Sequence, residues 1–212
     1  MPAEGRGLSS EPTSKVERGR RLGNLATPIS VQRLQTALHA RAKEEPEFRF
    51  HALYDKIYRM DVLEHAYACC RANKGAPGID GVTFEGVETY GWELWLGELA
   101  KQLRDKKYRP EAVRRVFIPK LNGKLRPLGI PRLADRVCQT AAMLVLGPIF
   151  EADMPSEQYA YRQNRNALDA VREVHGFLVS SHEDVVDADL SGYLDRASYC
   201  PLIHEVVANR WG

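Results

Sequence analysis

The chain has 212 residues, with 44% hydrophobic and 27% charged side chains, an ordinary globular composition that suffices for one large domain or two small ones. Its four cysteines include no Cys-x-x-Cys pair, which argues against a zinc knuckle and favours reduced, buried thiols. No apolar signal-peptide core follows the amino terminus, and the longest apolar run, Ala141–Phe150, is too short to span a bilayer. We therefore expect a soluble cytoplasmic protein with no membrane partner.

The net charge of +2 hides an uneven distribution along the chain. Residues 101–136 contain 12 basic and 3 acidic side chains, a net of +9, whereas residues 137–212 contain 5 basic and 11 acidic ones, a net of −6. This asymmetry indicates a polyanionic partner at one surface and a cation site at another.

The first elements in chain order are a leader and a series of helices. Residues 1–30 are rich in Gly, Ser, Pro, Arg and Glu without an apolar period, so we expect a disordered leader. Apolar residues at helical spacing predict helices over Ser30–Lys43, Phe50–Asn73, Tyr90–Asp105, Ala134–Phe150, Asn166–Ser180 and Pro201–Arg210. In the fifth of these, the residues expected to face inward are Ala167, Ala170, Val171, Val174 and Phe177.

A basic β-hairpin is predicted in the middle of the chain. Two β-prone segments, Arg114–Lys120 and Leu125–Ile130, flank a turn at Leu121–Lys124 that contains Asn-Gly, a strong hairpin signal. The cations on or beside it are Arg114, Arg115, Lys120, Lys124, Arg126, Arg132 and Arg136. Such a density of Lys and Arg suits the binding of phosphates, and the alternative is a solvated charged face. Helices, a hairpin, and then further helices with a strand predict an α+β fold.

Paired acidic residues follow in the segment predicted as a strand, Glu183–Leu190. Alternate side chains of a strand share a face, so Asp187 and Asp189 would point the same way. Carboxylates at the end of a buried strand suit Mg²⁺, which prefers oxygen ligands and supports phosphoryl transfer in pairs. The alternative is that these acids cap a helix or pair with the basic residues.

Aromatic and cationic residues alternate between Tyr159 and Ala170. Arg162 and Arg165 precede the predicted helix, with Tyr159 and Tyr161 interleaved. Rings that stack on bases, combined with cations, suit a nucleic-acid strand. In the alternative interpretation, the tyrosines complete the core.

Taken in chain order, these segments resemble the reverse transcriptases encoded by bacterial group II introns, over about residues 32–212. The matching motifs are Asn73–Gly81, Val116–Pro131, Asp135–Ala141, Pro148–Asp153, Tyr159–Ala170 and Val185–Asp195. The resemblance implies right-hand polymerase fingers and a partial palm, helix-rich with a basic β-hairpin. The implied domains are a helical amino-terminal extension over residues 31–110, fingers over 111–182, and the start of the palm over 183–212.

The resemblance also implies a role for individual residues. Asp189 matches the catalytic, metal-binding first aspartate of the palm, with the Leu190 carbonyl as a second Mg²⁺ ligand and part of the nucleotide site. Lys120 and Arg126 match the cations that hold the triphosphate of the deoxynucleoside triphosphate. Leu194 stands where the family has an aromatic ring under the sugar. The residues expected to contact RNA are Arg114, Arg115, Lys124, Arg162 and Arg165.

The resemblance implies RNA-directed DNA synthesis on a template-primer, with group II intron RNA as a further partner. No Asp-Asp pair occurs in the chain, although the family uses one for the remaining metal ligands. We therefore expect a polymerase truncated before its second catalytic aspartate motif and inactive alone. The alternatives are an intron RNA-binding splicing module of maturase type without polymerase activity, or a decayed product that does not fold stably.

Overall fold

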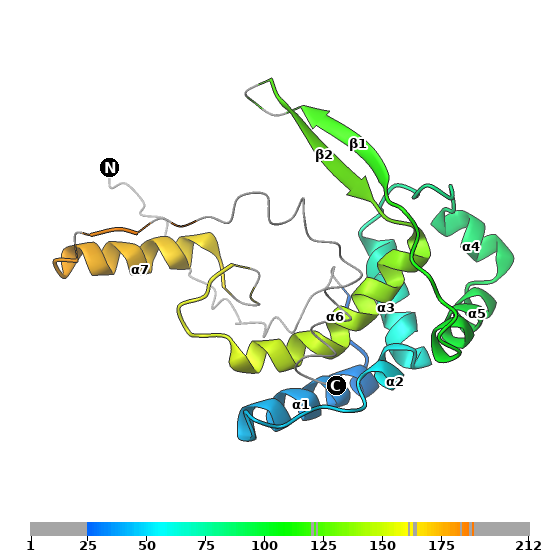
Figure 1. Ribbon diagram of the computed structural model, residues 1–212, viewed down its shortest axis with the longest axis horizontal. Coiled ribbons are helices and arrows are strands. Elements are labelled where there is room, and N and C mark those ends of the chain that lie inside the picture. The colour runs from blue at the N-terminus through cyan, green and yellow to red at the C-terminus, as the bar shows by residue number, and fades with distance from the viewer. Residues whose placement is uncertain are drawn as a thin grey trace, which may run out of the picture.

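The computed structural model describes residues 25–119, 121, 123–160, 162, 165–182, 184–186 and 188. The elements in chain order are α1 (Ile29–Glu44), α2 (Tyr54–Ile57), α3 (Met60–Ala72), α4 (Phe84–Tyr90), α5 (Trp92–Arg104), β1 (Arg114–Pro119), β2 (Leu125–Ile130), α6 (Leu133–Asp153) and α7 (Ala167–Val179). Helices α1–α6 form a body from which the hairpin projects, and α7 follows the far end of α6 (Figure 1). The described residues therefore form a helix-rich α+β structure with one two-stranded antiparallel sheet.

The core lies around α6, which packs along α1 and α3, while α5 packs against α3 and α4. Apolar residues recur along α6 at helical spacing and meet those of the neighbouring helices, as expected for a helix with a wide apolar face. The largest fully buried side chains are Leu63, Leu96, Leu133, Leu144, Ile149, Val31, Val62, Val137, Val145 and Cys69. One cluster of buried side chains thus joins α1, α3, α4 and α5 to α6.

Helix α6 continues through Pro148 to Asp153, although the sequence predicted that it ends at Phe150. Proline has no N–H, so the carbonyl of Leu144, four residues earlier, loses its partner within the helix. The side-chain Nε2 of Gln35 in α1 donates to this carbonyl at 3.0 Å, and Gln35 itself is buried. A side chain from α1 therefore supplies the hydrogen bond that Pro148 removes.

The single helix predicted over Phe50–Asn73 is wrong, because the chain forms α2 and α3 instead. Arg59 between them has an extended backbone with φ −62° and ψ 136°, and its carbonyl accepts from the N–H groups of Val62 and Leu63 at 3.1 and 3.0 Å. The Arg59 guanidinium also donates to Asp61 at 2.7 and 3.0 Å. Local hydrogen bonds therefore begin a new helix within a continuous apolar pattern.

Helix α4 was not predicted, and the helix expected over Tyr90–Asp105 begins at Trp92 instead. Thr83 caps α4, since its hydroxyl oxygen accepts from the N–H of Gly86 at 3.1 Å. Capping by a Thr side chain is a recognised start signal. The signal was present at Thr83, but the helix it begins has only 7 residues.

Helix α6 is long and apolar enough, by length and composition, to cross a membrane. This is weak evidence, because the core helix of a folded protein passes the same test. The apolar run at Ala141–Phe150 is therefore shorter than the apolar helix that contains it, Leu133–Asp153. Its buried residues nevertheless extend from Leu133 to Ala152, against other helices of the body.

Helix α7 forms as predicted, but its predicted inward face is wrong among the described residues. Val171, Val174 and Phe177 are 62%, 54% and 48% exposed, and α7 has no buried residue. The residues described within the strand expected at Glu183–Leu190 are 184–186 and 188, and they form no strand. The remaining positions of that segment, and the helix expected at Pro201–Arg210, lie outside the described residues.

The cysteines within the described residues are free, as expected. Cys69 and Cys70 are buried and Cys138 is half-buried. Burial raises the pKa of Cys69 to about 11 and that of Cys138 to about 12. These thiols therefore stay protonated and unreactive at neutral pH, because the thiolate is the nucleophile. Cys200 lies outside the described residues.

Candidate nucleic-acid interface

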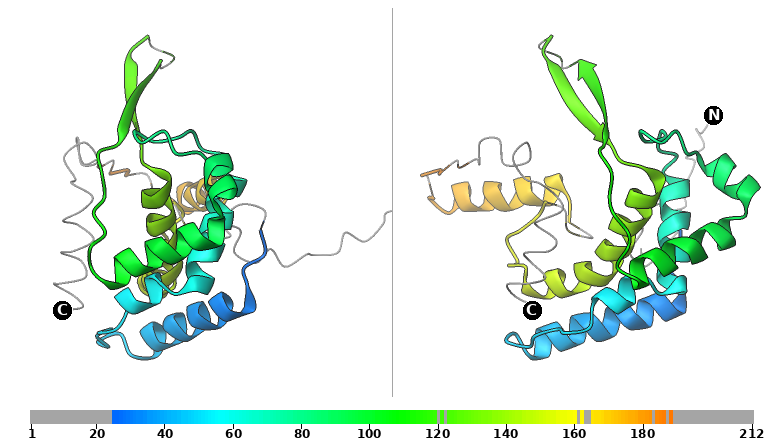
Figure 2. Two further views of the ribbon diagram at one scale, coloured as in Figure 1. Left: turned by 90° about the vertical axis from the view of Figure 1, so that its right-hand side faces the viewer. Right: turned by 45° about the vertical axis from the view of Figure 1, so that its right-hand side comes forward.

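The hairpin β1–β2 projects from the helical body in each view of Figure 2. The hairpin forms where the sequence predicted it, and its register pairs Arg114 with Ile130 and Pro119 with Leu125. Directly opposed residues share a face of the sheet. One face therefore contains Arg114, Val116, Ile118, Arg126, Leu128 and Ile130. The other contains Arg115, Phe117, Pro119, Leu125, Pro127 and Gly129.

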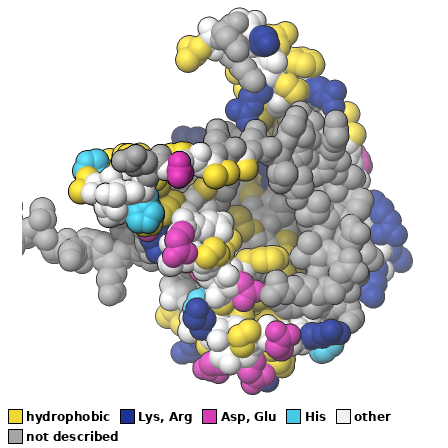
Figure 3. Space-filling model, turned by 60° about the vertical axis from the view of Figure 1, so that its left-hand side comes forward, with side chains coloured by type: hydrophobic (Ala, Val, Ile, Leu, Met, Phe, Trp, Pro, Cys, Tyr) yellow, Lys and Arg dark blue, Asp and Glu magenta, His cyan; other side chains and the backbone are white. Residues whose placement is uncertain are grey.

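The two faces of the hairpin both combine cations with exposed apolar side chains. Arg114 and Arg126 share one face, and Arg115 lies on the other. Phe117 is 55% exposed, and the space-filling view shows apolar and cationic side chains together on the projecting hairpin (Figure 3). Cations beside apolar surface are the combination that contacts both the phosphates and the bases of a nucleic acid.

Arg114, Arg115 and Arg126 form no ion pair with any carboxylate in the described part of the chain. The Nε of Arg114 is buried and has no hydrogen-bond acceptor among the described residues. A buried N–H without an acceptor is unfavourable, because the loss of its hydrogen bonds to water is not offset. These three predicted site residues therefore retain positive charge for an external anion.

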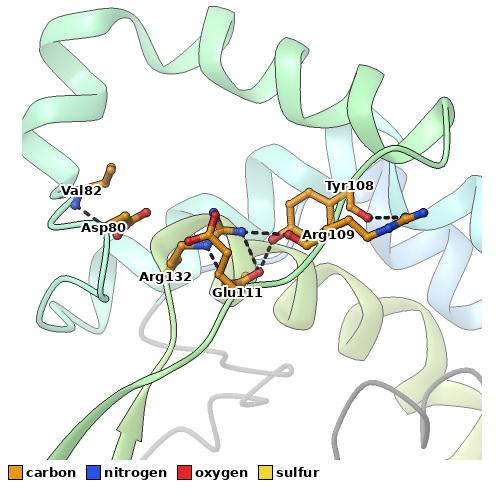
Figure 4. A network of polar contacts seen from close by, with 7 residues as sticks. Asp80, Val82, Tyr108, Arg109, Glu111 and Arg132 are labelled. Carbon is orange, nitrogen blue, oxygen red and sulfur yellow. Dashed lines mark hydrogen bonds and ion pairs between the residues drawn. The ribbon is translucent and has the colours of Figure 1, made fainter.

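Arg132, by contrast, forms ion pairs within the protein at the base of the hairpin (Figure 4). Its Nη1 lies 2.6 Å from Glu111, and its Nε lies 3.0 Å from Asp135. The carboxylates neutralise this guanidinium, whose side chain is 15% exposed. Fewer cations between residues 101 and 136 are available to a ligand than the sequence indicated, because Arg132 forms ion pairs within the protein.

Arg162 and Arg165, the cations predicted to bind RNA from the loop before α7, both have intramolecular partners. Arg162 donates to Glu151 of α6 from Nε at 3.0 Å and from Nη2 at 2.8 Å, and its side chain is 12% exposed. Arg165 lies over the ring of Tyr159 at 5.1 Å, and the Tyr159 hydroxyl donates to Glu173 of α7. These contacts join the loop to α6 and α7, and a contact of either arginine with RNA stays a prediction.

The loop at Asn73–Gly81 packs against the start of α6. A Cβ at Gly78 would lie 2.6 Å from the Cα of Arg132, so only glycine permits this approach. The side chain of Arg136, in the first turn of α6, lies over the Phe84 ring of α4 at 5.7 Å. The sequence predicted a turn here but not the packing of the loop against α6. The glycines of the loop were the signal for such a close approach.

The predicted palm residues Asp187, Asp189, Leu190 and Leu194 lie outside the described residues, as does Lys120 of the hairpin. Within the described ranges, no group of three or more His, Cys, Asp or Glu side chains could hold a metal ion. Lys124 is described and exposed at the end of the turn. The structure thus brings Arg114, Arg115, Lys124 and Arg126 onto one hairpin, while the metal site stays a prediction.

Comparison with known proteins identifies relatives across most of the chain, although no protein-family model matches it. Protein YkfC of Escherichia coli is 35% identical over 183 residues, which cover 83% of this chain and 48% of that protein. Group II intron-encoded protein LtrA of Lactococcus lactis is 29% identical over 155 residues, which cover 73% of this chain and 25% of LtrA. A putative COX1/OXI3 intron 1 protein of Saccharomyces cerevisiae is 27% identical over 69% of this chain and 17% of that protein.

The matched stretch spans about half of YkfC and a quarter or less of the two intron proteins. It nevertheless covers more than two thirds of this chain in each case. The chain is therefore a homologue of group II intron-encoded protein LtrA and of the yeast COX1/OXI3 intron proteins.

Proposed function

We propose that this chain forms the fingers side of an RNA-directed DNA polymerase of the group II intron type, and that its hairpin binds the phosphates of RNA. The observation that carries the proposal is the set of three arginines on the projecting hairpin without an ion pair among the described residues. The homology to a group II intron-encoded protein supports RNA as the polyanion. Arginine presents a fork of donors that matches phosphate oxygens.

The same hairpin is proposed to hold a deoxynucleoside triphosphate. Arg126 and Lys120 would donate to the triphosphate, and Arg114 and Arg115 would contact the template-primer backbone. Two Mg²⁺ ions would activate the primer hydroxyl and stabilise the leaving oxygen. Asp189 and the Leu190 carbonyl are the proposed Mg²⁺ ligands in this chain, with Leu194 beneath the sugar.

The binding proposal predicts a salt-dependent affinity that the hairpin cations control. We would measure fluorescence anisotropy of a labelled group II intron RNA fragment at several salt concentrations. Each neutralised phosphate contributes about 0.7–0.9 to the slope of log affinity against log salt. Replacing Arg114, Arg115 and Arg126 with alanine should lower the affinity at least about tenfold at ~0.1 M salt and reduce the slope by about 2.

The matched control removes three exposed cations away from the hairpin, namely Arg33 of α1, Lys101 of α5 and Lys107. Both triple variants change the net charge equally, so a general electrostatic effect would weaken RNA binding in both. The proposal requires a much larger loss in the hairpin variant. Equal losses, or an affinity for RNA that does not depend on salt, would contradict it.

Primer extension on poly(rA)·oligo(dT) separates polymerisation from RNA binding alone. We propose that the chain is inactive alone, because it contains no Asp-Asp pair to supply the remaining metal ligands. Mg²⁺-dependent synthesis that disappears in Asp189→Asn would contradict this inactivity while supporting the relation to polymerases. RNA binding without synthesis is the expected result, and it fits both an inactive polymerase and the splicing module of maturase type. The absence of both would contradict the proposed function as a whole.

A further inference from the structure

The hairpin is joined to the body through two short segments, residues 105–113 before β1 and residues 131–132 after β2. One guanidinium bonds across these two segments. Arg132, which follows β2, donates from Nη2 to the carbonyl of Arg109 at 3.1 Å and from Nη1 to Glu111 at 2.6 Å (Figure 4). The two connections therefore hold each other at the point where the hairpin leaves the body.

Asp135 then fixes both connections to the first turn of α6. Its side chain is 4% exposed and accepts from the Nε of Arg132 at 3.0 Å. It also accepts from the hydroxyl of Tyr108, which precedes β1. Burial raises the pKa of Tyr108, so its hydroxyl keeps its proton and remains a donor. A single buried carboxylate is thus the common acceptor for the segments on both sides of the hairpin.

Close packing adds to these hydrogen bonds. A Cβ at Gly129, near the end of β2, would lie 2.8 Å from Cγ2 of Val113, which precedes β1. A Cβ at Gly78 would lie still closer to the backbone of Arg132, at 2.6 Å from its Cα. Buried bidentate bonds to a carboxylate have strict geometry, so rotation of the hairpin about its base would break several contacts together.

We propose that Arg132, Asp135 and Tyr108 form a lock that sets the orientation of the hairpin relative to the helical body and thereby positions Arg114, Arg115 and Arg126. The three are positioning residues, since Arg132 is neutralised and Asp135 is buried. The orientation itself can be tested without a ligand, whereas its effect on RNA rests on the proposed function. Preorganised cations bind more tightly, because less ordering is required on association.

The test is the distribution of distances between two spin labels, one at the hairpin turn and one on the body. Leu121→Cys places a label at a fully exposed turn residue, and Glu93→Cys places one on the exposed side of α5. Cys200 is replaced by serine, and the protonated thiols of Cys69, Cys70 and Cys138 react slowly with the label. The labelled protein with the intact lock should give one narrow distribution.

Asp135→Asn keeps the shape of the side chain and removes its charge, and should broaden the distribution about twofold. Asp61→Asn is the matched control, because Arg59 donates to Asp61 with the same two-bond geometry at the start of α3. The control should leave the width unchanged. A loss of stability alone would not broaden the distribution of the folded population, so the width separates orientation from structural support.

Glu111→Ala provides a second variant in case Asp135→Asn does not fold, because the Glu111 side chain is 56% exposed. It should broaden the distribution less, since only one contact of Arg132 is removed. The affinity for RNA should fall about three- to tenfold in the lock variants. The salt slope should not change, because the hairpin cations remain.

Unchanged widths in every lock variant that folds would overturn the lock, whatever the RNA measurements show. A narrow distribution that broadens in the lock variants, together with no RNA binding by the wild type, would support the lock and overturn the proposed function. The two proposals therefore fail separately.

Discussion

Helices α3 and α7 have the same length of 13 residues and are both amphipathic, yet their apolar faces have different surroundings. In α3, Val62, Leu63 and Ala66 are completely buried against the rest of the body. In α7, Val171 and Val174 are more than half exposed, and no side chain is buried. An amphipathic pattern thus identifies which face of a helix is apolar, but it does not identify what covers that face.

The hairpin differs from both helices, because exposed apolar side chains and cations lie together on a projecting element. Its two strands pair only with each other among the described residues, so each also has an outer edge of backbone groups that no strand pairs. Its stability and its orientation depend on its base. The body and α7 should therefore respond differently to equivalent substitutions.

The largest contrast is expected between core residues and the exposed face of α7. Leu144→Ala in α6 should lower the free energy of unfolding by about 2–5 kcal/mol, because it leaves a cavity beside closely packed helices. Val174→Ala in α7 should change it by less than about 0.5 kcal/mol. Urea denaturation followed by circular dichroism measures both. A large loss in Val174→Ala would show that α7 is covered in solution.

A smaller loss is expected where α1 supports α6. Gln35→Leu should cost about 1–3 kcal/mol, since the carbonyl of Leu144 is left buried without a donor. In a Pro148→Ala background, residue 148 regains its N–H and can bond to Leu144 within the helix. Gln35→Leu should then cost less, and a double-mutant cycle measures the difference. Equal costs in both backgrounds would contradict the proposed compensation.

Helix caps provide a third comparison between the body and α7. Thr83→Ala removes the cap of α4 and should lower the global free energy of unfolding by about 1 kcal/mol. Asn166→Ala removes the cap of α7, where its side chain accepts from the N–H of Asp169 at 3.0 Å. That loss should appear as faster amide hydrogen exchange within α7, with no change in global unfolding. A global effect of Asn166→Ala would place α7 in the same cooperative unit as the body.

The smallest effect expected is a dependence on pH through His65 of α3. Burial lowers the pKa of His65, whose side chain is 5% exposed. The unfolded chain then binds more protons between the folded pKa and the unfolded value of about 6.5, so the free energy of unfolding falls as pH decreases through this window. His65→Gln should flatten the profile measured by urea denaturation. An unchanged profile in His65→Gln would contradict the assignment.

Much of the fold could be predicted from the sequence, because its signals were local. The Asn-Gly turn identified the hairpin, and apolar spacing identified α1, α6 and α7. The break between α2 and α3 could not be predicted, since the apolar pattern continues through Arg59 while local hydrogen bonds start a new helix. The passage of α6 through Pro148 depends on Gln35, a residue far away in sequence, which no local pattern includes.

The sequence predicted which basic residues lie at the candidate site, but not which of them form ion pairs within the protein. Local charge density singled out Arg114, Arg115 and Arg126, which have no ion pair among the described residues. The same density included Arg132, whose carboxylate partners are visible only in three dimensions. Arg162 likewise bonds to Glu151, 11 residues earlier in the chain. Sequence gives the number of charges, whereas the fold decides which of them are neutralised.

The hydrogen bond from Gln35 to Leu144 has a consequence for how the chain is made, because 109 residues separate its two ends. At a synthesis rate of about 5–20 residues per second, Gln35 is added to the chain roughly 5–20 s before Leu144. During that interval Gln35 of α1 has no Leu144 carbonyl to bond to, and the last turns of α6 do not yet exist. Helix α1 is thus synthesised early but reaches its final contacts late. Removal of α1 by a protease during synthesis would leave the Leu144 carbonyl of α6 without the hydrogen bond that Pro148 cannot donate.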